Sequence, residues 1–452
     1  MYTPLVQNQR KFFLSQGTKS LDYRKDLLLK LRSVLQENEV ELQRAVHADF
    51  GKSRFDFLTT EMSMIYNELD FFLKNLDSLA APTTAKTNLS NLPALSSIHY
   101  DPLGVALIIA PWNYPVQLSF TPAIAALAAG NTVILKPSEL TPKTSEVIAH
   151  IINSNFSMHQ LHVVEGGVAE SKALLEQRFD KIFFTGSVET GRKVYKAAAE
   201  HLTPVTLELG GKSPCIVAKS APVDVAAKRI VWGKFLNAGQ TCIAPDYIYV
   251  HSSVKDELIA RMIENIEKAE YEPNAAWYPK IVNFEHFERI LKLIDQQKVV
   301  YGGQHHAEKR YIQPTLMDNV SWDDAVMGEE VFGPVLPILC YEDWEQMEYE
   351  ITHRPSPLAA YLFSRDSHEK ARFKTHFHFG GGCINDVVMH VANPHLPFGG
   401  VQFSGTGSYH GKFGFEAFSH AKPIMHRATF GEPNIKYPPY TEEKLKWVKK
   451  LL

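Results

Sequence analysis

The sequence predicts an α/β fold with two doubly wound, mainly parallel-sheet domains and a small oligomerisation arm. Its 452 residues exceed the usual size of one domain, and 45% hydrophobic with 21% charged residues is ordinary for a globular chain. From residue 105 onward, short apolar runs alternate with segments of helical composition. Apolar strands separated by helices are typical of parallel sheets that are covered on both faces.

Residues 20–80, which precede the alternation, are expected to be helical. Apolar side chains recur there at three- and four-residue steps and mark one helix face: Met62, Ile65, Leu69 and Phe72. Gly51 is expected to end a helix.

The first alternating series is expected to form one parallel sheet. Its buried strands are predicted at 105–110, 132–135, 162–165, 181–184 and 205–209, and helices between them at 122–129, 143–152 and 191–201. In such sheets ligands bind beyond the carboxyl ends of the strands, and polar motifs follow several of these strands.

A second alternating series runs from about residue 213 to 393, with a helix expected at 254–269. We therefore divide the chain into residues 1–208, including an extended arm at about 81–103, residues 209–393, and residues 394–452, which return to the first domain and end in a tail. This division places the boundary near Glu208, beside a cleft between the two domains.

Two segments lie outside the alternation. Residues 81–100 are rich in Pro, Thr, Ser and Asn, so they are expected to be an extended connector or an arm that reaches another subunit. The tail, residues 441–452, is a basic amphipathic stretch that predicts a solvated helix docked on the body. A membrane-surface or substrate-gating role for this tail is the less favoured alternative.

Composition excludes several functional classes. A net charge of -3 gives no reason to expect a nucleic-acid partner, and no apolar run is long enough for a stable membrane anchor. No signal peptide is visible, and four widely spaced cysteines form neither a disulfide framework nor a metal site. His390 and His395 also lack partners at ligand spacing, so no metal is expected. The widely spaced cysteines and the lack of a visible signal peptide favour a cytoplasmic localisation, and peripheral membrane contact through the tail is left open.

Cys242 is the leading candidate for chemistry. It lies in the run Asn-Ala-Gly-Gln-Thr-Cys-Ile-Ala-Pro, while Glu208 lies upstream in Leu-Glu-Leu-Gly-Gly-Lys. A thiol can attack a carbonyl carbon, and a buried carboxylate can take a proton from water. The two together suggest covalent catalysis through a thioester that is then hydrolysed. Alone, a cysteine is more often a small core residue, and Cys215, Cys340 and Cys383 are interpreted as structural.

Other motifs are ambiguous when taken singly. Gly186, Ser187 and Gly191 follow a strand and open a helix, which suits a phosphate site or simply a tight turn. Lys136 and Glu139 follow another strand and could hold a ribose, although an ordinary surface pair is favoured by spacing alone.

Two further motifs are equally open. Asn113, between Trp112 and Tyr114 in Pro-Trp-Asn-Tyr-Pro, could donate to an oxyanion, although taken alone it is favoured only to satisfy its own turn. Glu330 could bind a ribose, and Phe332 could pack on a flat ring.

In this order the motifs resemble those of the aldehyde dehydrogenase superfamily over most of the chain. The strings are Pro-Trp-Asn-Tyr-Pro, Lys-Pro-Ser-Glu, Phe-Thr-Gly-Ser, Leu-Glu-Leu-Gly-Gly-Lys-Ser-Pro, Gly-Gln-Thr-Cys and Glu-Val-Phe-Gly-Pro. The early start and the stretches 241–247, 384–388 and 407–412 look like the class 3 branch, which includes fatty and aromatic aldehyde dehydrogenases.

The resemblance implies a role for each catalytic residue. Cys242 would form a thiohemiacetal with the aldehyde, while the Asn113 amide and the Cys242 backbone N–H would hold the oxyanion. Glu208 would activate water to release the acid. Members that transfer the acyl group to coenzyme A lack this glutamate, so its presence here favours hydrolysis. A thioester or ester hydrolase that uses the same pair without redox chemistry is the alternative.

The resemblance also implies a cofactor, NAD or NADP, and leaves the choice between them open. The residues it places beside the cofactor are Trp112, Lys136, Ser138, Glu139, Gly186, Ser187, Gly191, Glu330 and Phe332. It further implies a homodimer and a medium- or long-chain aliphatic or an aromatic aldehyde as substrate.

Overall fold

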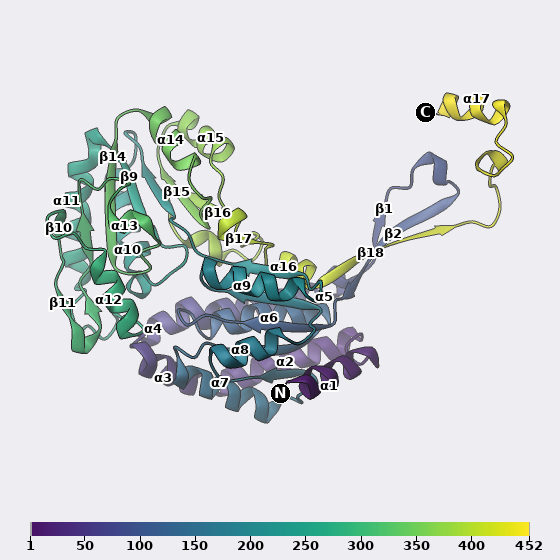
Figure 1. Ribbon diagram of the computed structural model, residues 1–452, viewed down its shortest axis with the longest axis horizontal. Helices are drawn as coiled ribbons and strands as arrows, with labels where there is room; N and C mark the ends of the chain where they lie inside the picture. The colour runs from purple at the N-terminus through teal and green to yellow at the C-terminus, as the bar shows by residue number, and fades with distance from the viewer. Residues whose placement is uncertain (1, 452) are drawn as a thin grey trace.

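The computed structural model describes residues 2–451 and confirms the α/β fold class (Figure 1). Two helix-covered sheets form the body, and a third, smaller sheet extends from it as an arm. The two large sheets follow one another in the chain. The strands on either side of Gly210 and Gly211 belong to different sheets.

The first sheet of the described chain has six strands in the order β17-β7-β6-β3-β4-β5. Neighbouring strands are parallel except β17, which runs antiparallel to β7. The strands are β3 (Val105–Ile109), β4 (Thr132–Lys136), β5 (Leu161–Val163), β6 (Lys181–Thr185), β7 (Val205–Glu208) and β17 (Gly405–Thr406). The five strands predicted between residues 105 and 209 are thus present.

Alternate residues of these strands face two separate cores. Ala106 and Ile108 of β3 pack toward the layer that contains α2, α5, α6 and α7, whereas Val105 and Leu107 pack toward α1, α8 and α9. This half contains α1 (Thr3–Leu14), α2 (Leu21–Glu37), α3 (Glu39–Phe50), α4 (Arg54–Phe57), α5 (Ser63–Ala80), α6 (Gln117–Ala129), α7 (Pro142–Asn155), α8 (Val168–Leu175), α9 (Val188–Ala199) and α16 (Gly411–Ala417). The alternation explains why the strands are apolar on both faces.

Helix α6 is buried along its whole length, as expected for a helix without a polar face. It begins at Gln117, so the predicted start at Pro122 was too late, and Pro122 lies inside the helix. The true start is set from a distance, because the Glu61 carboxylate accepts hydrogen bonds from the N–H groups of Val116 and Gln117. No residue near 117 signals such a cap.

The second sheet has seven strands in the order β10-β13-β14-β9-β8-β15-β16 and is parallel except for β10. Its strands are β8 (Pro214–Val217), β9 (Tyr247–His251), β10 (Val299–Tyr301), β13 (Thr315–Met317), β14 (Val335–Tyr341), β15 (Ala359–Phe363) and β16 (Gly381–Ile384). Its helices are α10 (Val223–Phe235), α11 (Ser252–Ala269), α12 (Phe284–Lys292), α13 (Ala325–Gly328), α14 (Trp344–Thr352) and α15 (Ser367–His376). A small hairpin joins β11 (His305–His306) to β12 (Tyr311–Ile312).

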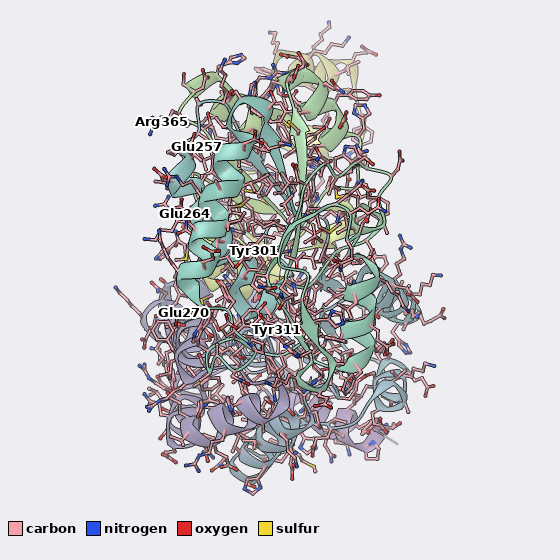
Figure 2. The ribbon with its side chains drawn as sticks, turned by 90° about the vertical axis from the view of Figure 1, so that its left-hand side faces the viewer. Glu257, Glu264, Glu270, Tyr301, Tyr311 and Arg365 are labelled. Atoms are coloured by element: carbon pink, nitrogen blue, oxygen red, sulfur yellow. The ribbon has the colours of Figure 1, made fainter. Side chains whose placement is uncertain are left out.

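Helix α11 runs along the outer side of this half, with Glu257 and Glu264 on the face shown in Figure 2. Leu258, Met262 and Ile266 of the same helix are buried. The predicted helix at 254–269 is therefore present, with its acidic side chains on the outside and its apolar ones against the sheet.

The arm is a three-stranded antiparallel sheet of β1 (Thr83–Ala85), β2 (Ala94–Pro102) and β18 (Ser419–Arg427), in the order β1-β2-β18. Strands β2 and β18 pair along their full lengths, from Ser419 opposite Pro102 to Arg427 opposite Ala94. Figure 1 shows this sheet projecting from the body. The polar segment around residues 81–100 is therefore an arm rather than a plain connector.

Helix α17 (Glu442–Leu451) follows the arm and lies at its far end (Figure 1). Its contacts are with the short helix η7 (Asn434–Lys436), so the expected docking on the body was wrong. The reason is topological, because β18 carries the chain outward before the tail begins. Within residues 2–451 no helix combines the length and the apolarity that a bilayer crossing requires.

The four cysteines are all free, but they lie in different surroundings. Cys215 is fully buried in β8, as a core residue should be. Cys340 is exposed on β14 rather than packed in the core. Cys383 is half-buried, with its sulfur 3.6 Å from His390 Nδ1.

Candidate active site

Residues from both halves of the chain meet beyond the carboxyl ends of the first sheet's strands, where the second half contributes segments that precede its own strands. The loop after β3 carries Asn113, and β7 ends at Glu208. Cys242 comes from the second half, after α10 and the short helix η3 (Leu236–Gly239). A hydrogen bond of 3.0 Å from Asn113 Nδ2 to the Gln240 carbonyl joins the two halves two residues before the cysteine.

Cys242 is partly exposed and is held by its neighbours in the chain. Thr241 shares a 2.7 Å hydrogen bond with the Tyr114 hydroxyl, and the Tyr361 hydroxyl donates to the Ile243 carbonyl at 2.6 Å. Burial raises the pKa of the Cys242 thiol to about 12, and the charges of Glu330 and Glu208 add to the rise. The thiol is therefore protonated at neutral pH in the absence of a cofactor.

Glu208 is the last residue of β7 and is only 2% exposed. Neither carboxyl oxygen has a hydrogen-bond partner in the described chain. Burial raises the pKa of Glu208 well above that of an ordinary glutamate. A buried carboxyl group without partners needs a water or a ligand beside it, which is the setting of a general base.

Asn113 is buried, and its backbone and side chain are both fixed. Its carbonyl accepts hydrogen bonds from Asn237 Nδ2 at 2.9 Å and from Lys52 Nζ at 3.3 Å. Its amide nitrogen donates one hydrogen to Gln240, so a second hydrogen is available for another acceptor. That acceptor would lie close to the Cys242 segment.

Glu330 lies against the loop that follows Glu208. Its carboxylate accepts a hydrogen bond from the Gly211 N–H, and a Cβ at Gly210 would lie 1.9 Å from its Oε2. Burial raises the pKa of Glu330 to about 8, and the nearby charge of Asp246 adds to the rise. Only a residue without a side chain leaves room for this carboxylate at position 210.

Trp112 and Phe332 meet across the two halves. Their ring centroids are 5.4 Å apart in an edge-to-face arrangement, and His286 of α12 lies 5.4 Å from Trp112. Phe332 adopts a left-handed backbone conformation with φ of 45°, which is costly for a bulky residue. Such conformations persist where the surroundings fix them, often at binding sites.

Lys136 and Glu139 form a 3.0 Å ion pair beyond β4. Lys136 is 1% exposed, so the alternative of an ordinary surface pair was wrong. The carboxylate side chain of Glu139 is 43% exposed and can reach a ligand. Ser138 accepts from the Leu140 N–H at 3.2 Å and so shapes the turn that carries them.

Helix α9 presents its N-terminus beyond β6. Ser187 caps it by accepting from the Thr190 N–H at 3.3 Å, while the N–H groups of Val188 and Glu189 have no intrahelical partner. These donors and the helix dipole suit a phosphate. Gly191 has a packing role, because a Cβ there would lie 2.6 Å from Leu209 Cδ2.

Several residues that matter here were missed in the sequence. Arg289 of α12 donates to the carbonyls of Glu330 at 3.3 Å and Val331 at 2.8 Å and so supports their loop. Lys52 and Glu61 form a buried pair beneath Asn113. Each of these residues lies in an ordinary helical stretch or beside one, and no local pattern distinguishes it.

Together these residues provide what a carbonyl reaction requires. A partly exposed thiol lies near a buried carboxyl group, beside an amide with a free N–H. A helix N-terminus and an acidic side chain beyond β4 provide groups that suit the phosphates and the ribose of a dinucleotide. The donor set therefore fits a dinucleotide cofactor.

Comparisons with known proteins point the same way. A family model described as "Aldehyde dehydrogenase family" matches residues 5–424. The 4,4'-diaponeurosporen-aldehyde dehydrogenase of Staphylococcus aureus (strain NCTC 8325 / PS 47) is 44% identical over 447 residues, which are 98% of this chain and 97% of that protein. Aldehyde dehydrogenase family 3 member A2 of Rattus norvegicus is 42% identical over 98% of this chain and 93% of its own. A solved structure of Staphylococcus aureus AldH in a substrate-bound state superposes with a TM-score of 0.97 at 43% identity, covering 100% of this chain and 99% of that one.

Proposed function

The chain belongs to the aldehyde dehydrogenase family, and from this premise we propose that Cys242, Glu208 and Asn113 carry its chemistry. The protein is an oxidoreductase that oxidises aldehydes to carboxylic acids, in a family that uses NAD(P). The observation that carries the proposal is a partly exposed thiol near an unpartnered buried carboxyl group.

In the proposed mechanism the Cys242 thiol gives up its proton to solvent, and its sulfur attacks the aldehyde carbonyl to form the thiohemiacetal oxyanion. The free hydrogen of the Asn113 amide and the Cys242 backbone N–H stabilise the charge that develops on the oxygen. A dinucleotide held by the residues named below would supply a hydride acceptor for the thiohemiacetal carbon. Glu208 then takes a proton from a water molecule, which attacks the resulting thioester and releases the acid.

For the cofactor we propose that Lys136, Ser138 and Glu139 hold the adenosine ribose. The phosphates would lie at the N-terminus of α9, with Gly186, Ser187 and Gly191. Trp112, Glu330 and Phe332 would contact the nicotinamide side, where Glu330 lies close to Cys242.

NAD is the favoured dinucleotide in this proposal, and NADP is accepted less well. The exposed carboxylate of Glu139 would repel a 2′-phosphate, while Lys136 offsets part of its charge. We expect Glu139→Gln to raise kcat/KM for NADP relative to NAD by roughly tenfold, because the like charge is removed. Initial rates with each dinucleotide at saturating aldehyde measure this ratio, and an unchanged ratio would contradict the assignment of Glu139.

For the substrate we propose a medium- or long-chain aliphatic or an aromatic aldehyde. Tyr114 and Tyr361 are buried, and their hydroxyls hydrogen-bond to Thr241 and to the Ile243 carbonyl, on either side of Cys242. Their rings add apolar surface beside the Cys242 segment. The Staphylococcus aureus relative is named for 4,4'-diaponeurosporen-aldehyde.

The test is a rate panel with hexanal, a long-chain aldehyde and benzaldehyde, each with NAD and NADP. Absorbance of the reduced nicotinamide should rise with at least one pair and not in a Cys242→Ser control. Absence of any rise with every pair would exclude this substrate range. The alternative of a hydrolase without redox chemistry finds no support in the relatives, which are named as aldehyde dehydrogenases.

We propose residues 1–208, together with the return of 394–452, as the cofactor domain and residues 209–393 as the catalytic domain, which matches the two large sheets. The arm would join two copies in a homodimer, because it projects from the body with apolar side chains exposed. Four free thiols support a reducing compartment such as the cytoplasm.

A further inference from the structure

Beneath the loop that carries Asn113 lies a buried ion pair that the mechanism above does not use. Lys52 Nζ is 2.7 Å from Glu61 Oε1, and the two side chains are 1% and 0% exposed. Lys52 follows the left-handed cap Gly51 at the end of α3, and Glu61 lies on the π-helical turn η1 (Leu58–Met62). A buried pair seldom adds net stability, because removing two charges from water is costly. Its presence therefore calls for a role other than stability.

Both partners bind the loop between β3 and α6. Glu61 Oε2 accepts hydrogen bonds from the N–H groups of Val116 at 2.8 Å and Gln117 at 3.2 Å, at the start of α6. Lys52 Nζ donates to the Asn113 carbonyl at 3.3 Å. The pair thus fixes this loop at Asn113 and again three residues further on.

The same pair reaches the segment that carries the nucleophile. Lys52 Nζ lies 4.0 Å from the centre of the Tyr114 ring, and the Tyr114 hydroxyl shares a 2.7 Å hydrogen bond with Thr241. Asn113 Nδ2 donates to the Gln240 carbonyl at 3.0 Å. Two contacts therefore connect the pair to the residues directly before Cys242.

We infer that Lys52 and Glu61 are positioning residues that hold the Asn113 amide and the Gln240–Cys242 segment in the geometry that stabilises the oxyanion. This inference rests on the oxyanion role proposed for Asn113. Because a shift of about 1 Å in a reacting group can lower a rate by about 100-fold, a loop held at both ends has a direct effect on turnover. The pair acts through Asn113 and does not touch the substrate.

A double-mutant cycle on the rate of the first turnover tests the coupling. The variants are Lys52→Met, Asn113→Ala and their combination, measured with hexanal and saturating NAD. If the pair acts through Asn113, Lys52→Met should lower the rate by about 10-fold in the native background and by less than about 2-fold when Asn113 is already absent. The KM for NAD should change little, because neither residue lies among the proposed cofactor contacts.

Lys255→Met is the matched control, since Lys255 of α11 forms a 2.8 Å, largely buried pair with Asp318, which directly follows β13. It should lower the denaturation midpoint without lowering the rate.

If Lys52→Met does not fold, the neutral pair Lys52→Met/Glu61→Gln, which leaves no buried charge unpaired, enters the same cycle. Equal rate losses with and without Asn113, or no loss at all, would overturn the positioning role. A native rate in Asn113→Ala would instead remove the oxyanion role of Asn113 itself.

Discussion

At the scale of single residues, the surroundings of Cys242 keep its thiol neutral. Burial raises its pKa to about 12, and the negative charges of Glu330 and Glu208 disfavour the thiolate further. The reactive form of a cysteine is the thiolate. The free enzyme therefore has a weak nucleophile, and its reactivity should rise when the negative charges beside it are removed.

This arrangement predicts how alkylation of Cys242 depends on pH. The rate with iodoacetamide should rise about tenfold per pH unit through the alkaline range, because the solution stays below the thiol pKa. Glu330 has a pKa of about 8, so it is mostly protonated at pH 7 and mostly ionised near pH 9. Glu330→Gln should therefore speed alkylation near pH 9 and change it little at pH 7.

Labelling is followed by mass spectrometry in the absence of dinucleotide. Cys242→Ser reports the label taken by the other thiols, including the exposed Cys340. Glu208→Gln should have a smaller effect near pH 9, since the charge of Glu208 raises the thiol pKa less than the charge of Glu330 does. Equal rates for Glu330→Gln and the native enzyme near pH 9 would show that Glu330 does not act on the thiol.

The separate roles proposed for Cys242 and Glu208 give a second prediction. Cys242→Ser should abolish formation of reduced dinucleotide, because no acyl-enzyme can form. Glu208→Gln should keep a first burst of it and lower the steady-state rate by about 100- to 10,000-fold, since only hydrolysis needs the base. Stopped-flow absorbance with trapping of the acyl-enzyme distinguishes the two, and loss of the burst in both variants would refute separate roles.

At the scale of elements, the turn before Cys242 has an unusual backbone. Asn237, Ala238 and Gly239 are consecutive left-handed residues with φ of 54°, 53° and 74°. Outside glycine this conformation costs about 1–2 kcal/mol per residue. The cost is tolerated because the turn is buried and Asn237 donates hydrogen bonds to the carbonyls of Asn113 and Gln240.

Gly239→Ala is therefore expected to destabilise this turn. A Cβ at this position would lie 2.2 Å from the Gly333 carbonyl oxygen, and the positive φ adds strain of about 1–2 kcal/mol. We expect a clearly lower urea midpoint and a loss of activity, because the Cys242 segment and the Glu330 loop must both move. Gly328→Ala is the control, since a Cβ there has no neighbour within 4 Å. Matching midpoints for the two variants would contradict this account.

The sequence predicts an element well when the residues that determine it lie within that element or close to it. The strands from 105 to 209 were predicted because continuous apolar runs record burial on both faces. The start of α6 was predicted five residues too late, because its cap is Glu61, 56 residues upstream of Gln117. The left-handed turn at Asn237 and the Lys52–Glu61 pair leave no local pattern, since both depend on contacts made after folding.

At the scale of the whole molecule, the carboxyl ends of the first sheet's strands lie beside segments that precede strands of the second sheet, so the fold sets a residue's surroundings more than its local motif does. Their spacing in the sequence favours a surface pair for Lys136 and Glu139, yet the Lys136 ammonium group is buried at the end of β4. The tail was predicted to be an amphipathic helix, and it is a helix. Its position at the end of the arm, however, has no signal in the nearby sequence. Long-range pairing of β2 with β18 sets that place.

The arm carries the last prediction. Leu95 on β2 and Met425 on β18 are 74% and 47% exposed, and β18 is an edge strand with one row of unpaired backbone groups. A projecting sheet with apolar side chains and an open edge is suited to a contact between copies of the chain. The double variant Leu95→Lys/Met425→Lys should therefore shift the protein toward monomer, because burying two lysines at such a contact is costly.

Light scattering coupled to size-exclusion chromatography measures the mass, with Leu14→Lys on the exposed end of α1 as the control. An unchanged dimer mass in the double variant would mean that another surface joins the subunits, and a monomer in the native protein would remove the dimer from the proposal altogether.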